Sequence, residues 1–220
     1  MPLTKRSLFE PRQVENTRDR IIKAFSKCIH EKGIASVSLR TIAQKAGVSL
    51  GTVHYYFRSR ENLITQTIEY ELDFIANDIQ RRFNSSDSPE RKLRAICEEG
   101  RDFAQTELQI AFFEIWTASM RNKIMKKSFA SFYTRLSDLI SAVIREGKQQ
   151  GIFRDVPEDL VANSIIAMVE GAGLQCLMRG KAVCHFAETF DLMVESVMDY
   201  LKINKTAPNP LPAKYTRQSL

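Results

Sequence analysis

The sequence predicts an all-α protein of about nine helices, with a short N-terminal three-helix unit followed by a larger helical bundle. Three observations support this fold class. Apolar residues recur at steps of three, four and seven along nearly the whole chain, which is the helical period. Glycine (9 residues) and proline (7 residues) are scarce, which favours long elements and few loops. No strand-like alternation, internal repeat or low-complexity tract interrupts the pattern.

The helix boundaries follow from capping residues. Gly33 and Gly47 are C-cap residues that end the first two helices. Ser38 and Ser49 are N-caps for the short helices LRTIAQKA and LGTVHYYF, and Ser59 begins the fourth helix. Ser88 with Pro89 begins the fifth, because proline fits the first helical position. The expected helices span about 15–32, 39–46, 50–57, 60–83, 89–106, 108–121, 123–149, 157–179 and 183–203.

Positive charge is concentrated in the first quarter of the chain. The net charge is +6, but residues 1–60 hold 12 Lys and Arg against 4 Asp and Glu, so the remainder is slightly acidic. This asymmetry favours a nucleic-acid contact at one end of the molecule, with a solvated basic face as the alternative. We predict domains at 1–60 and 61–203 and a flexible tail at 204–220.

Composition excludes several other classes of protein. No apolar run reaches the roughly 18 residues of a membrane span, and the N-terminus has no apolar signal region, so we expect a cytoplasmic protein. The four cysteines form no CxxC pair and predict neither a disulfide framework nor a zinc site. No nucleophile elbow, metal cluster or phosphate loop is visible, so we expect neither an enzyme nor a cofactor or metal.

Residues 38–57 have the pattern of a helix-turn-helix. Gly47 supplies the positive φ that a tight turn between two short helices needs, and Val48 fills the angle between them. Val53 and Phe57 lie one turn apart and are expected to pack against the preceding helix. Gly51 keeps the start of the second helix slim, so that its backbone can approach DNA closely. The free N–H groups at this helix end can bind phosphate.

These segments resemble the TetR family of bacterial transcriptional regulators. The resemblance rests on TRDRIIKAFSKCIHEKG (17–33), SLRTIAQKAGVSLGTVHYYF (38–57) and RSRENL (58–63). The chain departs from the family pattern at His54, where a Tyr is usual, and at Arg60, where a Lys usually opens the fourth helix. Both substitutions keep a hydrogen-bonding or cationic group, so DNA binding is still expected, whereas base preference at position 54 is open.

The resemblance implies a set of DNA-binding residues. Thr52 and His54 are candidates for base contact, and Arg40 is expected to set specificity because arginine reads guanine bidentately. Tyr55 and Tyr56 offer hydroxyls to phosphates, although Tyr55 is equally compatible with a core position. The full set is Arg18, Ser38, Arg40, Thr41, Ser49, Leu50, Gly51, Thr52, His54, Tyr55, Tyr56, Arg58 and Arg60, with Arg12 as a further phosphate contact; the alternative for Arg58 and Arg60 is pairing with acids such as Glu61.

The C-terminal part is expected to dimerise and to bind a ligand. A single helix-turn-helix reads one half-site, so specific binding requires a homodimer. The family usually dimerises through its last two helices, whose apolar stripes here (Leu160 to Leu177 and Phe186 to Tyr200) alternatively complete the monomer core. Aromatic and Met residues over 103–133 are candidates for an effector pocket, with plain core packing as the alternative. The candidate ligand residues are Phe103, Phe112, Trp116, Met120, Phe132, Met168 and Gln175.

The sequence therefore predicts a DNA-binding regulator that binds a palindromic operator and is released by a small-molecule effector. The resemblance implies repression, the more common mode in the family, with activation as the alternative. Trp116 with Glu114, Glu98, Asp102 or Glu170 suits a cationic ligand. The segments IAFFEIWTASM and EGAGLQ resemble the choline-responsive, BetI-like branch of the family. Two alternatives remain: a helical small-molecule-binding protein with a relic DNA head, and a non-specific DNA-binding protein.

Overall fold

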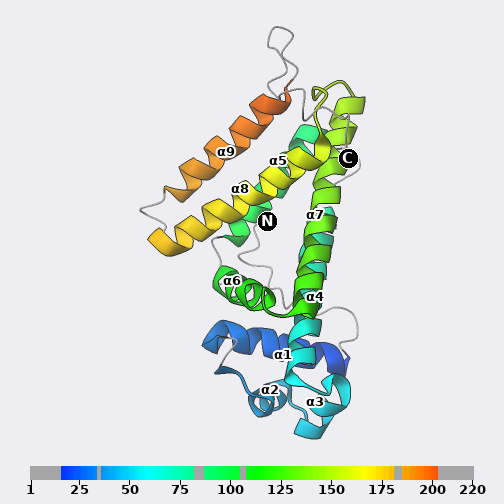
Figure 1. The fold of residues 1–220 in the computed structure, drawn as a ribbon, viewed down its shortest axis with the longest axis vertical. Helices are drawn as coiled ribbons and strands as arrows, with labels where there is room; N and C mark the ends of the chain where they lie inside the picture. Colours follow the sequence, from blue (N-terminus) through cyan, green and yellow to red (C-terminus); the bar gives the residue numbers. More distant parts are fainter. Residues whose placement is uncertain (1–15, 34–35, 82–86, 105–107, 181–184, 203–220) are drawn as a thin grey trace. The chain divides into compact units, whose positions relative to one another are not determined.

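The computed structural model describes residues 16–33, 36–81, 87–104, 108–180 and 185–202, and nine helices lie within these ranges (Figure 1). They confirm the predicted all-α fold class. The described ranges hold no strand, and one isolated antiparallel bridge joins Phe153 to Lys202. The helices are α1 (Thr17–Lys32), α2 (Leu39–Ala46), α3 (Leu50–Phe57), α4 (Arg60–Arg81), α5 (Pro89–Phe103), α6 (Leu108–Ser119), α7 (Lys123–Gln149), α8 (Glu158–Arg179) and α9 (Phe186–Leu201).

The chain divides into two compact units, each built from two stretches of sequence. The first unit holds Met1–Asp78 and Gln105–Tyr133, and the second holds Ile79–Ala104 and Thr134–Leu220. Helices α4 and α7 therefore contribute turns to both units. The division into domains at 1–60 and 61–203 groups residues by expected function and stays a prediction, and the tail at 204–220 lies outside the described residues.

Local signals set both ends of α1. The Asn16 side chain accepts a hydrogen bond from the backbone N–H of Asp19 and so caps the first turn. Gly33 ends the helix with φ +72°, and its N–H donates to the carbonyl of Ile29. The predicted C-cap is confirmed, because a left-handed φ of this kind is open to glycine at little cost.

The core of the first unit lies between α1, α2, α3 and α4. Helix α1 contacts both α2 and α6, so these three helices share one packed body. Burial of each large apolar side chain here stabilises the fold by about 1.5–3 kcal/mol. The fully buried side chains of this core are Ile21, Ile22, Phe25, Ile42, Val53, Phe57 and Leu63.

In the second unit, α5 packs against both α8 and α9. Ser88 caps α5 by accepting from the N–H of Arg91, and Pro89 occupies the first turn, as predicted. Gly100 allows α8 to come close: a Cβ at this position would lie 2.5 Å from Val169 Cγ1. The close packing of α5 against α8 therefore depends on the absence of a side chain at Gly100.

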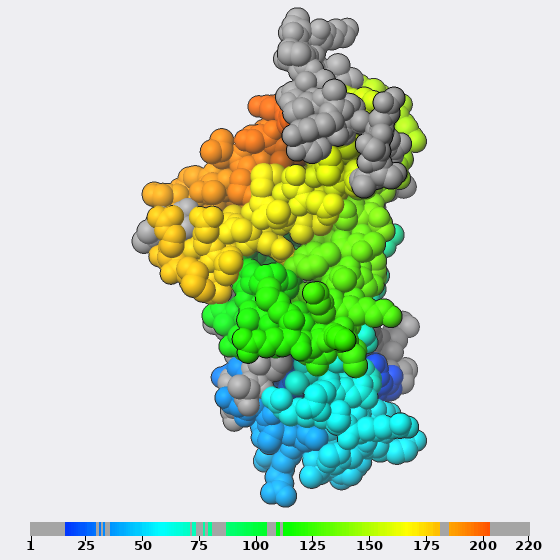
Figure 2. Space-filling view, in the orientation of Figure 1, coloured from blue at the N-terminus to red at the C-terminus, as the bar shows by residue number. Residues whose placement is uncertain are grey.

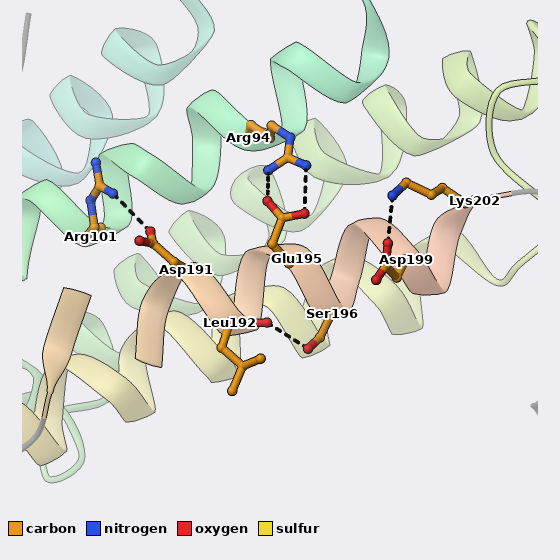
Figure 3. Close-up of polar contacts among 8 residues, drawn as sticks. All are labelled: Arg94, Arg101, Asp191, Leu192, Glu195, Ser196, Asp199 and Lys202. Carbon is orange, nitrogen blue, oxygen red and sulfur yellow. Dashed lines mark hydrogen bonds and ion pairs between the residues drawn. The ribbon is translucent and has the colours of Figure 1, made fainter. Parts of the chain in front are cut away.

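Ion pairs join α5 to α9 on the outside of this packing (Figure 3). Arg94 donates two hydrogen bonds to the Glu195 carboxylate, at 2.6 and 3.1 Å, and Arg101 lies 3.4 Å from Asp191. The hydrogen bond from Arg94 lowers the pKa of the Glu195 carboxyl. Leu192 points away from α5 in the same view, so α9 presents an acidic face to α5 and an apolar side chain elsewhere (Figure 3).

Candidate nucleic-acid interface

The turn between α2 and α3 is fixed by its own backbone and by two serine caps. Gly47 has φ +64° and ψ +39°, and its N–H donates to the carbonyls of Ala43 and Gln44. Ser38 accepts from the N–H of Thr41 at the start of α2. Ser49 does the same for Thr52 at the start of α3. The predicted helix-turn-helix is therefore formed with the predicted caps.

Helix α3 has one buried and one open face. Val53 and Phe57 are buried in the core of the first unit, as predicted. Tyr55 is 80% exposed, so the alternative that it belongs to the core is wrong. His54 and Tyr56 are also exposed. Figure 2 shows the α3 segment, in cyan, at the surface of its unit.

The first turn of α3 carries a glycine, and its hydroxyl groups are hydrogen-bonded within the chain. An added Cβ at Gly51 would meet only Ser49 Oγ, at 3.6 Å, so packing within the chain does not require glycine at this position. Leu50 and Thr52 are half-buried, and the Thr52 hydroxyl lies 2.8 Å from Ser49 Oγ. The hydroxyls of Ser38 and Thr41 pair in the same way at 2.9 Å. These four hydroxyls thus hold the first turns of α2 and α3, and their contact with DNA stays a prediction.

The candidate cations differ in how they are held. Arg40 on α2 is exposed, and so is Arg58, the C-cap residue of α3, which has φ +57°. Arg60 Nε donates to the carbonyl of Val37 at 3.3 Å, which ties the start of α4 to the segment before α2. Arg12 lies outside the described residues. Arg40 and Arg58 are therefore the candidates whose guanidinium groups stand open for DNA.

Arg18 takes part in a chain of hydrogen bonds rather than standing free. Its Nε and Nη2 donate to Gln66 Oε1 at 3.1 and 2.8 Å. Gln66 Nε2 donates to Asn62 Oδ1 at 3.0 Å, and Asn62 Nδ2 donates to the carbonyl of Phe57 at 2.9 Å. This relay joins α1, α4 and the last residue of α3. These hydrogen bonds therefore connect α4 directly to the C-terminal end of α3.

The sequence reasoning missed Arg20, which braces the turn from α1. Its Nη2 donates to the carbonyl of Ala46 at 2.7 Å and lies 3.4 Å from the carbonyl of Gly47. These are carbonyls at the C-terminal end of α2, where a cation is favoured by the helix dipole. No local pattern indicates this role, because 26 residues separate donor and acceptor. Lys45 adds a second link by pairing with Glu31 of α1 at 2.5 Å.

The candidate ligand residues are split between the two units. Four of them belong to the first unit: Phe112, Trp116, Met120 and Phe132. There the rings of Phe112 and Phe129 meet edge-to-face, with 5.7 Å between their centroids. Trp116 contacts Phe113 in the same geometry at 6.3 Å. The structure therefore brings part of the predicted aromatic cluster together on α6 and the first turns of α7. Phe103, Met168 and Gln175 belong to the second unit.

A small apolar cavity in the second unit lies between α5, α8 and α9. Met168 lines it together with Cys97 and Phe190, and it has room for no more than a water-sized molecule. Burial raises the pKa of the Cys97 thiol to about 12, so this thiol stays protonated. The described residues hold no group of three or more His, Cys, Asp or Glu that could bind a metal ion.

Comparison with known proteins agrees with this geometry. Residues 21–67 match the family model "Bacterial regulatory proteins, tetR family", and residues 89–201 match the model "BetI-type transcriptional repressor, C-terminal". The second match covers more than half of the chain and bears out the resemblance of the C-terminal segments to this branch.

Individual relatives extend along most of the chain. The HTH-type transcriptional regulator BetI of Burkholderia mallei is 25% identical over 170 residues, which are 76% of this chain and 85% of the relative. A TetR transcription regulator from Haloarcula marismortui has a similar fold, with TM-score 0.76, 22% identity, and coverage of 85% of this chain and 98% of that one. A transcriptional regulator from Saccharomonospora viridis, solved in complex with choline, has TM-score 0.70, 24% identity, and coverage of 83% and 94%.

Proposed function

The chain belongs to the TetR family of bacterial transcriptional regulators, and from this premise we propose that it represses transcription as a homodimer that binds a palindromic operator and leaves it when a small effector binds. The observation that carries the proposal is the open face of α3. It carries His54, Tyr55 and Tyr56, capped turns hold it, and two exposed arginines, Arg40 and Arg58, flank it. Such a helix enters the major groove and reads base edges.

The homodimer is supported by the surface of α8. This helix is long and apolar enough to cross a membrane by length and composition, yet only 28% of its most apolar window is buried within the chain. Val161 and Ile165 face the core, whereas Leu174 is 40% and Met178 is 73% exposed. On α9, Leu192 is 69% exposed. A second copy of the chain would cover these side chains and would place a second reading head on the same duplex.

The effector acts in this proposal by shifting a population of conformations. Within the first unit, α6 contacts α1, and α1 contacts α2. The relay from Arg18 through Gln66 and Asn62 ties α4 to the end of α3. A ligand that holds α6 or α4 in a different position would therefore change how the two reading heads are spaced. If the two α3 helices of the dimer no longer fit successive major grooves, they cannot bind both half-sites at once, and affinity for the operator falls.

The test is binding to the DNA upstream of the gene that encodes the protein, compared with a scrambled duplex over a series of salt concentrations. A cytoplasmic repressor of this kind is expected to prefer its site by about 10³-fold or more. Binding that is equally weak on both duplexes leaves an operator elsewhere in the genome or a non-specific head, and selection from random DNA then separates these two outcomes.

Arg40→Ala sharpens the same experiment. We expect it to cost about 1–3 kcal/mol on the operator and little on the scrambled duplex, because a base contact is lost. Arg60→Ala should weaken binding to both duplexes about equally and lower the salt slope by about one if Arg60 neutralises a phosphate. Equal losses on both duplexes for Arg40→Ala would reduce Arg40 to a phosphate contact.

A further inference from the structure

An exposed basic cluster lies at the turn from α6 to α7 in the first unit, outside the helix-turn-helix. Arg121, Lys123, Lys126 and Lys127 lie within seven residues of one another, and all four are exposed. No acidic residue occurs between Glu114 and Asp138 in the sequence. Among the residues that the structure describes, none of the four cations forms an ion pair or a hydrogen bond through its side chain. This local excess of positive charge is not apparent from the net charge of residues 61–220, which is slightly negative.

Apolar side chains are exposed beside these cations. Met120 is 55% exposed at the end of α6, and Ile124 is 65% exposed in the first turn of α7. Met120 follows Ser119, the last residue of α6, and lies in the turn that leads to α7. Figure 2 shows the α6 segment, in green, on the surface of its unit. Exposed apolar side chains next to unpaired cations mark a surface that a partner covers.

The same corner continues into the aromatic cluster. Phe113 and Trp116 are half-buried on α6, and Tyr133 is half-buried on α7, with its ring 6.4 Å from the buried Phe129. Lys126 lies three residues before Phe129 and seven before Tyr133, which places it on the same side of α7. The α6–α7 corner, residues 112–133, therefore joins aromatic rings, exposed apolar side chains and a rim of positive charge.

Two carboxylates, Glu69 on α4 and Glu114 on α6, are engaged with other parts of the first unit. Glu69 on α4 accepts a hydrogen bond from Ser128 Oγ at 2.9 Å. The Glu114 carboxylate lies over the end of α1, where a Cβ at Gly33 would be 3.4 Å from both of its oxygens. A site for a cation needs carboxylates that face the ligand, whereas the open charges here are positive.

We propose that the α6–α7 corner binds an amphiphilic anion, an apolar chain that ends in a carboxylate or a phosphate. The chain lies against Trp116 and Met120, and the charged end lies among Lys123, Lys126 and Lys127. DNA offers phosphates to these lysines but no apolar chain for the exposed Met120 and Ile124, so a nucleic acid is a poorer match. Helix α6 packs on α1, so a ligand at this corner can act on the helix-turn-helix as the effector of the proposed function. Only this role as effector rests on the proposed function.

The test uses the single tryptophan of the chain, Trp116, as the reporter of binding in the absence of DNA. Decanoate, 1-decanol and decyltrimethylammonium share one apolar chain and differ in charge, and choline carries the cationic head alone. We expect saturable change in Trp116 emission with decanoate at concentrations about tenfold lower than with decyltrimethylammonium. Tighter binding of decyltrimethylammonium or of choline would overturn the proposal.

Charge reversal then locates the site. Lys123→Glu with Lys126→Glu should weaken decanoate binding about tenfold and leave 1-decanol binding unchanged. The matched control, Arg145→Glu with Arg179→Glu, changes the net charge equally at exposed positions of the second unit and should leave both unchanged. Equal losses in the two double variants would show a general field effect and overturn the site. Lys126→Gln keeps the test decisive if the double variant does not fold.

Two further measurements distinguish a carboxylate from a phosphate head, and a monomeric ligand from a lipid surface. Decyl phosphate and decanoate compare the two anionic heads on chains of ten carbons. Vesicles of anionic phospholipid replace the monomeric ligand by a lipid surface. Binding to the vesicles without binding to monomeric decanoate would assign the corner to a membrane surface and overturn the proposal. Because no arm contains operator DNA, failure here and failure of the repressor function are distinguishable.

Discussion

The helix-turn-helix and helix α8 expose surfaces of opposite chemistry. Helix α3 is short and capped by Ser49, and its open face is polar. Helix α8 is long, its N-cap residue Pro157 makes no side-chain cap, and its open face carries Leu174 and Met178. The first surface suits the grooves of DNA, and the second suits another apolar helix. The two partners that we propose, DNA and a second copy of the chain, match the chemistry of these two exposed surfaces.

The largest expected effect comes from changing the open face of α8 to a charged one. Leu174→Glu with Met178→Glu should prevent dimerisation, because two copies would bring four carboxylates into one apolar interface. Affinity for a full operator should fall by about 10²–10⁴-fold, which is the usual gain from linking two binding modules. Sedimentation and operator titration measure the two quantities. Binding to a duplex with a single half-site is the control and should not change.

A variant that still sediments as a dimer would show that the stripe on α8 is not the dimer interface. Unfolding of the dilute variant checks that the chain still folds, and we expect little change because both side chains are exposed in the single chain.

The next effect concerns two glycines in the second unit that the sequence does not distinguish. Gly100→Ala should lower the free energy of unfolding by about 1–3 kcal/mol, because the new Cβ would overlap Val169, which must then move. At Gly171 of α8 no atom of the chain lies within 4 Å of an added Cβ. Gly171→Ala is therefore the matched control and should stabilise the single chain by about 0.5–1 kcal/mol. Chemical denaturation measures both. A loss of stability in Gly171→Ala that depends on protein concentration would place a partner helix at this glycine.

A smaller effect separates bracing of the turn from reading of DNA. Arg20→Ala should cost about 1–2 kcal/mol of stability, since it leaves the carbonyls at the end of α2 without their cationic donor. Arg40→Ala, at an exposed position of the same unit, should change stability by less than about 0.5 kcal/mol and act only on operator affinity. Denaturation and operator titration on both variants test this pair. If Arg20→Ala left stability unchanged, water would replace the guanidinium without loss.

The helix-turn-helix was predictable because its signals are local. Gly33, Ser38, Gly47 and Ser49 each act within four residues of their position, and all four have the predicted capping role. Arg20, Gln66 and the carboxylate of Glu114 act across 26 to 81 residues of sequence, so no pattern announces them. The same holds for the candidate ligand residues, whose distribution over two units depends on the packing of whole helices.

The apolar stripes of α8 and α9 show a second limit. Apolar spacing predicts that a helix is covered on one side, but it does not tell which side is covered by the chain itself. Phe190 is buried within the single chain, whereas Leu192, two residues later, is 69% exposed. Both belong to the same amphipathic helix, and only the packing of α9 against α5 and α8 separates them.

A small gain in stability is expected at Gly51, where the demands of folding and of DNA binding conflict. Gly51→Ala should raise the free energy of unfolding by about 0.5–1 kcal/mol, because alanine has the higher helix propensity. The new methyl group meets only Ser49 Oγ at 3.6 Å, an ordinary contact, so nothing within the chain opposes it. Affinity for the operator should nevertheless fall, because the methyl group would stand between the start of α3 and the DNA. Denaturation and operator titration of this one variant decide the point: a protein that is more stable and binds as well as before would show that α3 does not approach DNA closely at this residue.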